Sequence, residues 1–319
     1  MKIVYSDRYA VDLGAHVFPT AKYAGVQAAL LAQGLVLPAD FEAPPPATWE
    51  ELALVHTPDY LDKIRHGRLS PGELTQLEIP ATPDVVDWFR LMAGGTLLAA
   101  RAVAPGGTGG GMAADQSGAA AKPKRPWAVA VHLGGGFHHA FGNHGEGFCM
   151  INDVAVAIRA IKHGRLASRV AVVDCDVHQG NGTAMIFAAD RSVFTFSMHQ
   201  ENNYPGYKPR SALDIGLADG AGDDEYLEAL SSALPKVLAC GPDVIFFVAG
   251  ADPFREDQLG GLNLTLDGLR RRDRMVFEAS RAAGVPVVVT FAGGYAARLA
   301  DTIAIHVATV EEARRALSG

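Results

Sequence analysis

Short runs of β-branched residues alternate with stretches of helical periodicity along most of the chain, and this alternation most constrains the fold. Several runs are apolar at every position, as expected for strands buried on both faces of a parallel sheet. The alternation therefore predicts a three-layer α/β fold with a central, mostly parallel sheet and helices on both faces. Strands are expected at residues 2–6, 127–132, 169–174, 193–198, 243–248 and 285–291. Helices are expected at residues 22–33, 84–103, 153–163, 223–238 and 266–283.

One segment, at about residues 105–126, is rich in Gly, Ala and Lys and lacks the apolar residues needed for packing. We expect it to form a low-complexity surface loop. The residues before it supply only two or three helices and one strand, which is too little for an independent core. The chain, residues 1–319, is therefore expected to form a single domain.

Charge and cysteine content narrow the possible partners and compartment. The chain has 28 Lys and Arg against 35 Asp and Glu, a net charge of −7, so no overall basic field would hold nucleic acid or an anionic membrane. Its three cysteines, Cys149, Cys175 and Cys240, form no CxxC pair, which argues against a disulfide framework or a thiolate zinc site. Asp7 and Asp12 lie where a signal peptide would be apolar. We expect a soluble protein of the reducing cytoplasm, without direct nucleic acid or membrane partners.

Titratable residues gather directly after four of the predicted strands. Ligands of open α/β sheets bind beyond the carboxyl ends of the strands, so these residues are expected to share one site. They are His138 and His139, the Asp174-x-Asp176-x-His178 segment, Asp252, and Tyr295.

Two carboxylates and an imidazole in this group, Asp176, His178 and Asp252, suit a catalytic divalent metal with open positions for water and substrate. Asp174 could instead orient a neighbouring ligand or base.

The tandem His138 and His139 suit proton transfer near neutral pH. Tyr295 follows two glycines and could donate a hydrogen bond to a carbonyl oxygen on which negative charge develops. The chain contains no GxGxxG, GxxxxGK[ST], GxSxG or HExxH motif, so nucleotide binding and serine-hydrolase chemistry lack support.

Five ordered motifs together resemble the zinc-dependent histone deacetylase family. They are HLGGGFHHA at 132–140, GFCMIND at 147–153, VDCDVHQGNG at 173–182, AGADPF at 249–254 and AGGYA at 292–296. The resemblance extends from about His16 to Tyr295 and implies the arginase/deacetylase fold, with Zn²⁺ as the catalytic metal.

The resemblance also implies a role for each site residue. The zinc ligands would be Asp176, His178 and Asp252. The proton-transfer pair would be His138 and His139, with Asp174 and Asn181 as their respective partners. The phenol that polarises the carbonyl would be that of Tyr295. The acyl-lysine tunnel would be bordered by Gly147, Phe148, Tyr204 and Leu259. An internal product cavity would lie beside Lys22. A monovalent-cation site, usually filled by K⁺, would be formed by Asp174, Asp176, His178 and Ser197.

Several positions resemble the class IV branch of that family more closely than its nuclear branch. Asn181 replaces a carboxylate and Lys22 replaces an arginine, and the HQGNG and NNYPG segments agree with class IV. An amide makes its histidine partner less basic than a carboxylate would, so the division of acid and base between His138 and His139 stays open.

The implied substrate is an acylated lysine in a protein or peptide, or a small acylated amine. Class IV proteins are associated with long fatty acyl groups as well as acetyl, so the acyl length stays open. Leu259 carries no charge for the second ammonium of an acetylpolyamine, which makes that substrate the weaker candidate. Two alternatives are a two-metal ureohydrolase, whose DAHxD and DxDxxD motifs are missing, and a non-catalytic acyl-amine sensor.

Other polar residues receive weaker predictions. His56, His66 and His144 are expected at the surface, and Glu78 is a candidate rim acid for the substrate backbone. His199 could line the entrance or cap a strand.

Overall fold

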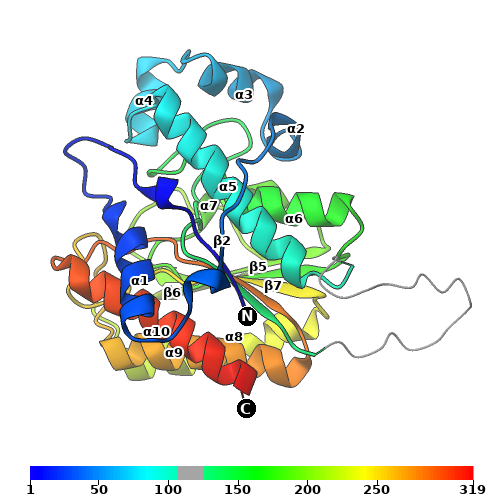
Figure 1. Cartoon of the computed structure of the whole chain (residues 1–319), viewed down its shortest axis with the longest axis vertical. Helices are drawn as coiled ribbons and strands as arrows, with labels where there is room; N and C mark the ends of the chain where they lie inside the picture. Colours follow the sequence, from blue (N-terminus) through cyan, green and yellow to red (C-terminus); the bar gives the residue numbers. More distant parts are fainter. Residues whose placement is uncertain (107–125, 319) are drawn as a thin grey trace, which may run out of the picture.

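Eight parallel strands form one sheet at the centre of the protein (Figure 1), in the order β2-β1-β3-β8-β7-β4-β5-β6. The computed structural model describes residues 1–106 and 126–318. The strands are β1 (Lys2–Val4), β2 (Phe41–Glu42), β3 (Val129–His132), β4 (Val170–Asp174), β5 (Val193–Gln200), β6 (Leu213–Leu217), β7 (Val244–Val248) and β8 (Val287–Thr290). All six predicted strands are confirmed, and most of the predicted surface loop at 105–126 lies outside the described residues.

The helices include the five predicted ones. They are α1 (Ala21–Ala32), α2 (Trp49–Leu52), α3 (Pro58–Arg65), α4 (Pro71–Leu77), α5 (Pro83–Val103), α6 (Asp153–His163), α7 (Asn181–Phe187), α8 (Asp223–Ala239), α9 (Leu266–Ala283) and α10 (Leu299–Ser318). Local sequence explains several starts: α3, α4 and α5 each begin with a proline preceded by Thr57, Ser70 or Thr82. The side chain of each of these three residues accepts a backbone N–H of the first turn. None of the described helices has both the length and the apolar character needed to cross a membrane.

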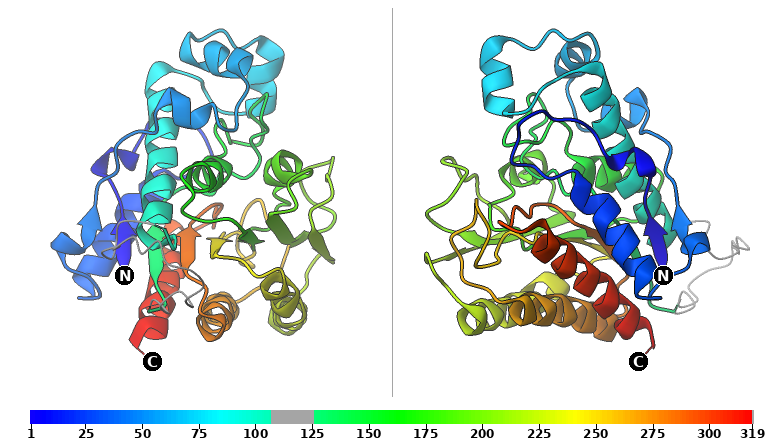
Figure 2. Two further views of the ribbon diagram at one scale, coloured as in Figure 1. Left: turned by 90° about the vertical axis from the view of Figure 1, so that its right-hand side faces the viewer. Right: turned by 60° about the vertical axis from the view of Figure 1, so that its left-hand side comes forward.

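Helices cover both faces of the sheet, which confirms the three-layer α/β architecture (Figures 1 and 2). Helices α5 and α6 pack together on one face, and α1, α10, α9 and α8 follow one another across the other. Alternate residues of β4 enter the two cores: Val170 and Val172 face the α5–α6 side, whereas Ala171 and Val173 join the larger cluster opposite. Burial on both faces is the reason that these strands are apolar at every position.

Four neighbouring strands, β3, β8, β7 and β4, end level with one another, and β5 beside them continues three residues farther. His132 of β3 pairs with Thr290 of β8, which pairs with Val248 of β7. Val248 pairs in turn with Asp174 of β4, and Asp174 pairs with Ser197 of β5. The segments that follow these strands are therefore brought to one edge of the sheet.

Candidate active site

A cavity opens at this edge, lined by segments that follow β3, β4, β5, β7 and β8. The sequence-predicted residues that line it are His138, His139, Gly147, Phe148, Asp176, His178, Tyr204, Leu259 and Tyr295. Asp252, Asp174 and Asn181 do not line the cavity but contact residues that do, from positions behind its wall. The structure thus brings together most of the predicted site.

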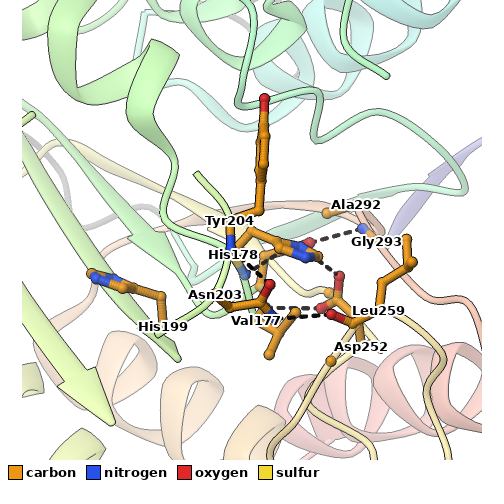
Figure 3. Close-up of polar contacts among 12 residues, drawn as sticks. Val177, His178, His199, Asn203, Tyr204, Asp252, Leu259, Ala292 and Gly293 are labelled. Atoms are coloured by element: carbon orange, nitrogen blue, oxygen red, sulfur yellow. Dashed lines mark hydrogen bonds and ion pairs between the residues drawn. The ribbon is translucent and has the colours of Figure 1, made fainter. Parts of the chain in front are cut away.

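Three buried side chains, those of Asp176, His178 and Asp252, place one potential metal-ligand atom each within 4.8 Å of the others. One oxygen of each carboxylate accepts a backbone hydrogen bond: Gly293 N donates to Asp176 Oδ2 at 2.9 Å, and Val177 N donates to Asp252 Oδ1 at 2.9 Å. Figure 3 shows His178 and Asp252 facing each other between Val177 and Gly293.

One oxygen of this triad, Asp252 Oδ2, is buried and has no hydrogen-bond partner among the described residues. His178 Nδ1 lies 3.5 Å from this oxygen. A buried carboxylate oxygen that accepts no hydrogen bond is costly, and coordination of a cation would compensate it. Two carboxylates and an imidazole are also a donor set that zinc accepts. The residues present therefore fit a divalent metal.

Close backbone approach makes two glycines necessary beside the triad. A Cβ atom on Gly293 would lie 1.9 Å from Asp252 Oδ2, and one on Gly250 would lie 2.7 Å from Asp176 Oδ2. The AGAD and AGGY motifs thus contain glycine where a side chain would displace a ligand oxygen.

The tandem histidines have different partners. Asp174 Oδ2 lies 2.8 Å from His138 Nδ1, whereas Asn181 Oδ1 lies 2.7 Å from His139 Nδ1. The two Nε2 atoms are 3.1 Å apart at the cavity. Each imidazole is therefore oriented from behind, with its Nε2 atom toward the reaction space.

These different partners help to shift the pKa values of the two histidines in opposite directions. Burial alone would lower the pKa of His138, but the carboxylates of Asp174 and Asp176 outweigh it and raise the pKa to about 9. Burial, together with the charges of His138 and His178, lowers the pKa of His139 well below its ordinary value. At neutral pH the pair thus combines a protonated ring with a neutral one.

Tyr295 is held from two sides. Its ring packs edge-on against Phe18 and Phe148, with centroids 5.9 and 6.1 Å away. Asp257 accepts the backbone N–H of Tyr295 at 2.6 Å and that of Leu259 at 2.9 Å. These bonds link the segment after β8 to the segment after β7. Burial and nearby carboxylates raise the pKa of the Tyr295 phenol well above its ordinary value, so the hydroxyl stays a donor.

The predicted tunnel residues form the outer wall of the cavity. The Tyr204 ring stands perpendicular to that of His139, with centroids 4.9 Å apart. Phe148 packs edge-on against His16 and Tyr295 and has a left-handed φ of 65°. Two aromatic rings and the Leu259 side chain therefore border the approach to the histidines.

Two further predicted residues, Lys22 and Ser197, also lie outside this cavity lining. Lys22 is fully buried, its Nζ donates to Ala292 O at 2.7 Å, and burial lowers its pKa to about 8. Ser197 is buried in β5, with its Oγ 3.0 Å from His199 Nδ1. Figure 3 shows His199 apart from the Asp252–His178 group, so His199 belongs to the strand rather than the entrance.

The surface prediction for His56 is wrong. His56 is 1% exposed, and its Nε2 accepts Asn152 N at 3.2 Å. His66 is exposed as predicted, whereas His144 is half-buried and stacks on Phe141 at 4.5 Å. Glu78 borders the cavity, where predicted.

Sequence reasoning missed Glu146, in the polar turn before Gly147. Its Oε1 accepts a hydrogen bond from Asn181 Nδ2 at 2.6 Å and another from the Tyr204 hydroxyl at 2.9 Å. These partners are distant in the sequence, and a glutamate in a polar turn carries no signal of such contacts.

A family model described as the histone deacetylase domain matches residues 16–310. The chain belongs to the histone deacetylase family. It is similar to an uncharacterized protein of Picosynechococcus sp., with 39% identity over 95% of each chain. Histone deacetylase 2 of Arabidopsis thaliana is 29% identical over 95% of this chain and 77% of its own. A histone deacetylase-like amidohydrolase of Pseudomonas aeruginosa is 32% identical over 82% and 68%.

Structural comparison agrees on the fold. The crystal structure of the HDA15 HD domain matches with a TM-score of 0.73 and 24% identity, over 98% of this chain and 91% of that one. The protein is thus a hydrolase of the histone deacetylase family with the expected fold. The class IV branch stays a prediction.

Proposed function

We propose that the protein is a zinc-dependent amidohydrolase that removes acetyl or longer acyl groups from the amine of lysine side chains or related acylated amines. The observation that carries this proposal is the buried Asp176–His178–Asp252 triad, in which one carboxylate oxygen accepts no hydrogen bond from the described residues, beside two oriented histidines and a tyrosine. Family membership supports the same reaction class.

Zinc would be held by Asp176, His178 and Asp252. When bound, it supplies Lewis-acid chemistry that polarises a carbonyl and lowers the pKa of water. A K⁺ ion is proposed from the family resemblance alone, at the site that Asp174, Asp176, His178 and Ser197 would form.

The opposite pKa shifts of the histidines support a division of roles. His139 Nε2 would accept a proton from the attacking water, and His138 would donate its Nε2 proton to the departing amine. The 3.1 Å contact between the two Nε2 atoms then allows a proton to pass from His139 to His138, which restores the pair. Water and amide are thereby converted to carboxylate and protonated amine, with no net proton gained or lost by the protein.

Tyr295 would donate a hydrogen bond to the substrate oxygen as negative charge develops there. Its burial and raised pKa support this role, because the phenol keeps its proton. Lys22, with its buried ammonium near Ala292, would bind the carboxylate product in an internal cavity.

The acyl-lysine chain would lie between Phe148 and Tyr204, beside Gly147 and Leu259. The net charge of −7 suits a cationic substrate better than nucleic acid. A long fatty acyl group is an alternative main substrate, whereas Leu259 disfavours acetylpolyamine. The ureohydrolase alternative requires more carboxylates than the three-residue metal group found among the described residues.

An acyl-chain series, acetyl through myristoyl on one lysine peptide, tests the proposal when combined with metal analysis. One tightly held zinc with amide cleavage supports the deacylase. Two manganese ions with amidine hydrolysis would support a ureohydrolase, and peptide binding without turnover would support a sensor.

A further inference from the structure

The carboxylate of Glu146 joins the partner of one histidine to the wall of the tunnel. We propose that Glu146 is a positioning residue: by fixing the direction of the Asn181 amide, it selects the His139 tautomer whose Nε2 atom can accept a proton. The claim about the His139 tautomer rests on hydrogen bonds alone, whereas the expected effect on kcat rests on the proposed function.

Glu146 is itself firmly held. Its backbone N–H and carbonyl form a two-bond bridge with Cys149, at 3.0 and 2.9 Å. Its carboxylate accepts Asn181 Nδ2 at 2.6 Å, the Tyr204 hydroxyl at 2.9 Å and Gln76 Nε2 at 2.9 Å, and His144 Nε2 lies 3.5 Å away. Burial alone would raise the pKa of Glu146, but the hydrogen bonds from these side chains outweigh it and lower the pKa to about 2. Glu146 is therefore a fixed, ionised acceptor.

An ionised carboxylate cannot donate a hydrogen bond, and this decides the direction of every bond in the chain from Glu146 to His139. Asn181 must turn its NH₂ group toward Glu146, so its carbonyl oxygen faces His139 Nδ1 at 2.7 Å. That oxygen only accepts, so Nδ1 must carry the proton. The neutral ring then has its lone pair on Nε2, toward the cavity.

Asn181 by itself could not make this selection. A side-chain amide presents either its oxygen or its NH₂ group, which have nearly the same shape, so it can satisfy either tautomer of a histidine. The opposite amide direction would place the ring proton on Nε2, where it would prevent proton uptake and face the proton of His138 Nε2, 3.1 Å away. A carboxylate at this position could only accept a hydrogen bond and would select the tautomer by itself. With an amide at this position, Glu146 fixes which end of Asn181 faces His139.

The same oxygen of Glu146 also holds Tyr204, whose ring stands perpendicular to that of His139. Space between these groups is small, because a Cβ atom on Gly147 would lie 2.8 Å from Tyr204 Cε1 and 3.0 Å from His139 Cδ2. Glu146 thus anchors the base and the adjoining tunnel wall at one point.

The test uses the zinc-loaded full chain and three sets of variants. Glu146→Ala removes the acceptor. Glu146→Ala combined with Asn181→Asp restores a pure acceptor beside His139 Nδ1, whereas Asn181→Asp alone places two carboxylates in contact. Gln76→Ala is the matched control, since it removes a hydrogen bond to Glu146 on its exposed side.

Two measurements are made on each variant. NMR of ¹⁵N-histidine-labelled protein reports which ring nitrogen of His139 carries the proton, and acetyl-lysine peptide hydrolysis gives kcat and KM. We expect Glu146→Ala to populate the Nε2-protonated tautomer and to lower kcat by at least about 10-fold with little change in KM, as when a group that orients a functional histidine is lost. The double variant should regain the Nδ1-protonated form and most of kcat. Asn181→Asp alone should have a lower kcat than the double variant. Gln76→Ala should match wild type.

The proposal is overturned if Glu146→Ala keeps the wild-type tautomer, or if the double variant is no better than either single one. The second comparison decides the matter even if Glu146→Ala alone folds poorly. Because the tautomer is read by NMR, wild-type protein with the expected tautomer but no amide hydrolysis would refute the proposed function and leave the positioning role intact.

Discussion

Replacing Asp174 with asparagine tests the link between a buried charge and the acid role of His138. The asparagine oxygen can still accept a hydrogen bond from His138 Nδ1, which Asp174 Oδ2 now contacts at 2.8 Å, so the change removes charge more than shape. With Asp174 present, the pKa of His138 is about 9 and roughly nine-tenths of the ring is protonated at pH 8. Without it, burial still lowers the pKa and the Asp176 carboxylate still raises it, so we expect a pKa near the ordinary 6.5.

At pH 8 only about 3% of the ring would then be protonated, so kcat should fall about 30-fold. At pH 6 most of the variant regains the proton, and the loss should shrink to less than about 2-fold. The sign follows from the raised pKa: the charged form is present below the pKa and is lost as pH rises through it. The assay is the pH profile of kcat on one acetyl-lysine peptide, with zinc content measured in parallel. An equal loss at pH 6 and pH 8 would show that Asp174 does not act by keeping His138 protonated.

Three further substitutions test the tyrosine, the metal site and the core packing. Tyr295→Phe should lower kcat by about 100- to 1000-fold, as for loss of one donor to a developing oxyanion, while zinc content stays unchanged; near-normal turnover would exclude the assigned role. Gly293→Ala should abolish tight zinc binding, measured by metal analysis after dialysis, because its Cβ atom would lie 1.9 Å from Asp252 Oδ2; retained zinc would contradict the ligand geometry. Phe247→Ala should lower the free energy of unfolding by about 3–5 kcal/mol in urea titrations, since Phe247 is fully buried against Phe277, and a loss below about 1 kcal/mol would argue against this packing.

The sheet centre could be predicted from sequence because burial on both faces leaves a strong local signal. Strands β4 and β7 read VAVVD and VIFFV, and every residue in them is buried. The polar residues directly after such strands could be assigned to one edge for the same reason, since parallel strands all end there.

The edges of the sheet gave weaker signals. Strand β6, with the sequence LDIGL, is mostly half-exposed and carries Asp214 and Gly216, while β2 has only two residues. Helix α10 was missed because it is rich in β-branched residues, which are typical of strands. Its packing against α1 and α9 decides its conformation instead.

Contacts between distant turns could not be predicted. Glu146 meets Asn181 across 35 residues and Tyr204 across 58, and neither spacing has a local pattern. His56 was placed wrongly at the surface for the same reason, because its burial depends on Asn152, 96 residues away. The sequence thus predicted the reacting groups and the two histidine partners, Asp174 and Asn181, whereas the contacts of Glu146 are visible only in the fold.

Whether this protein is a zinc amidohydrolase is decided by metal-dependent hydrolysis of an acetyl-lysine peptide. We expect one zinc per chain, amide cleavage that stops when a chelator removes the metal, and recovery when one equivalent of zinc is restored. Full hydrolysis by the metal-free protein, or no cleavage of any acyl-lysine peptide by the zinc-loaded protein, would contradict it.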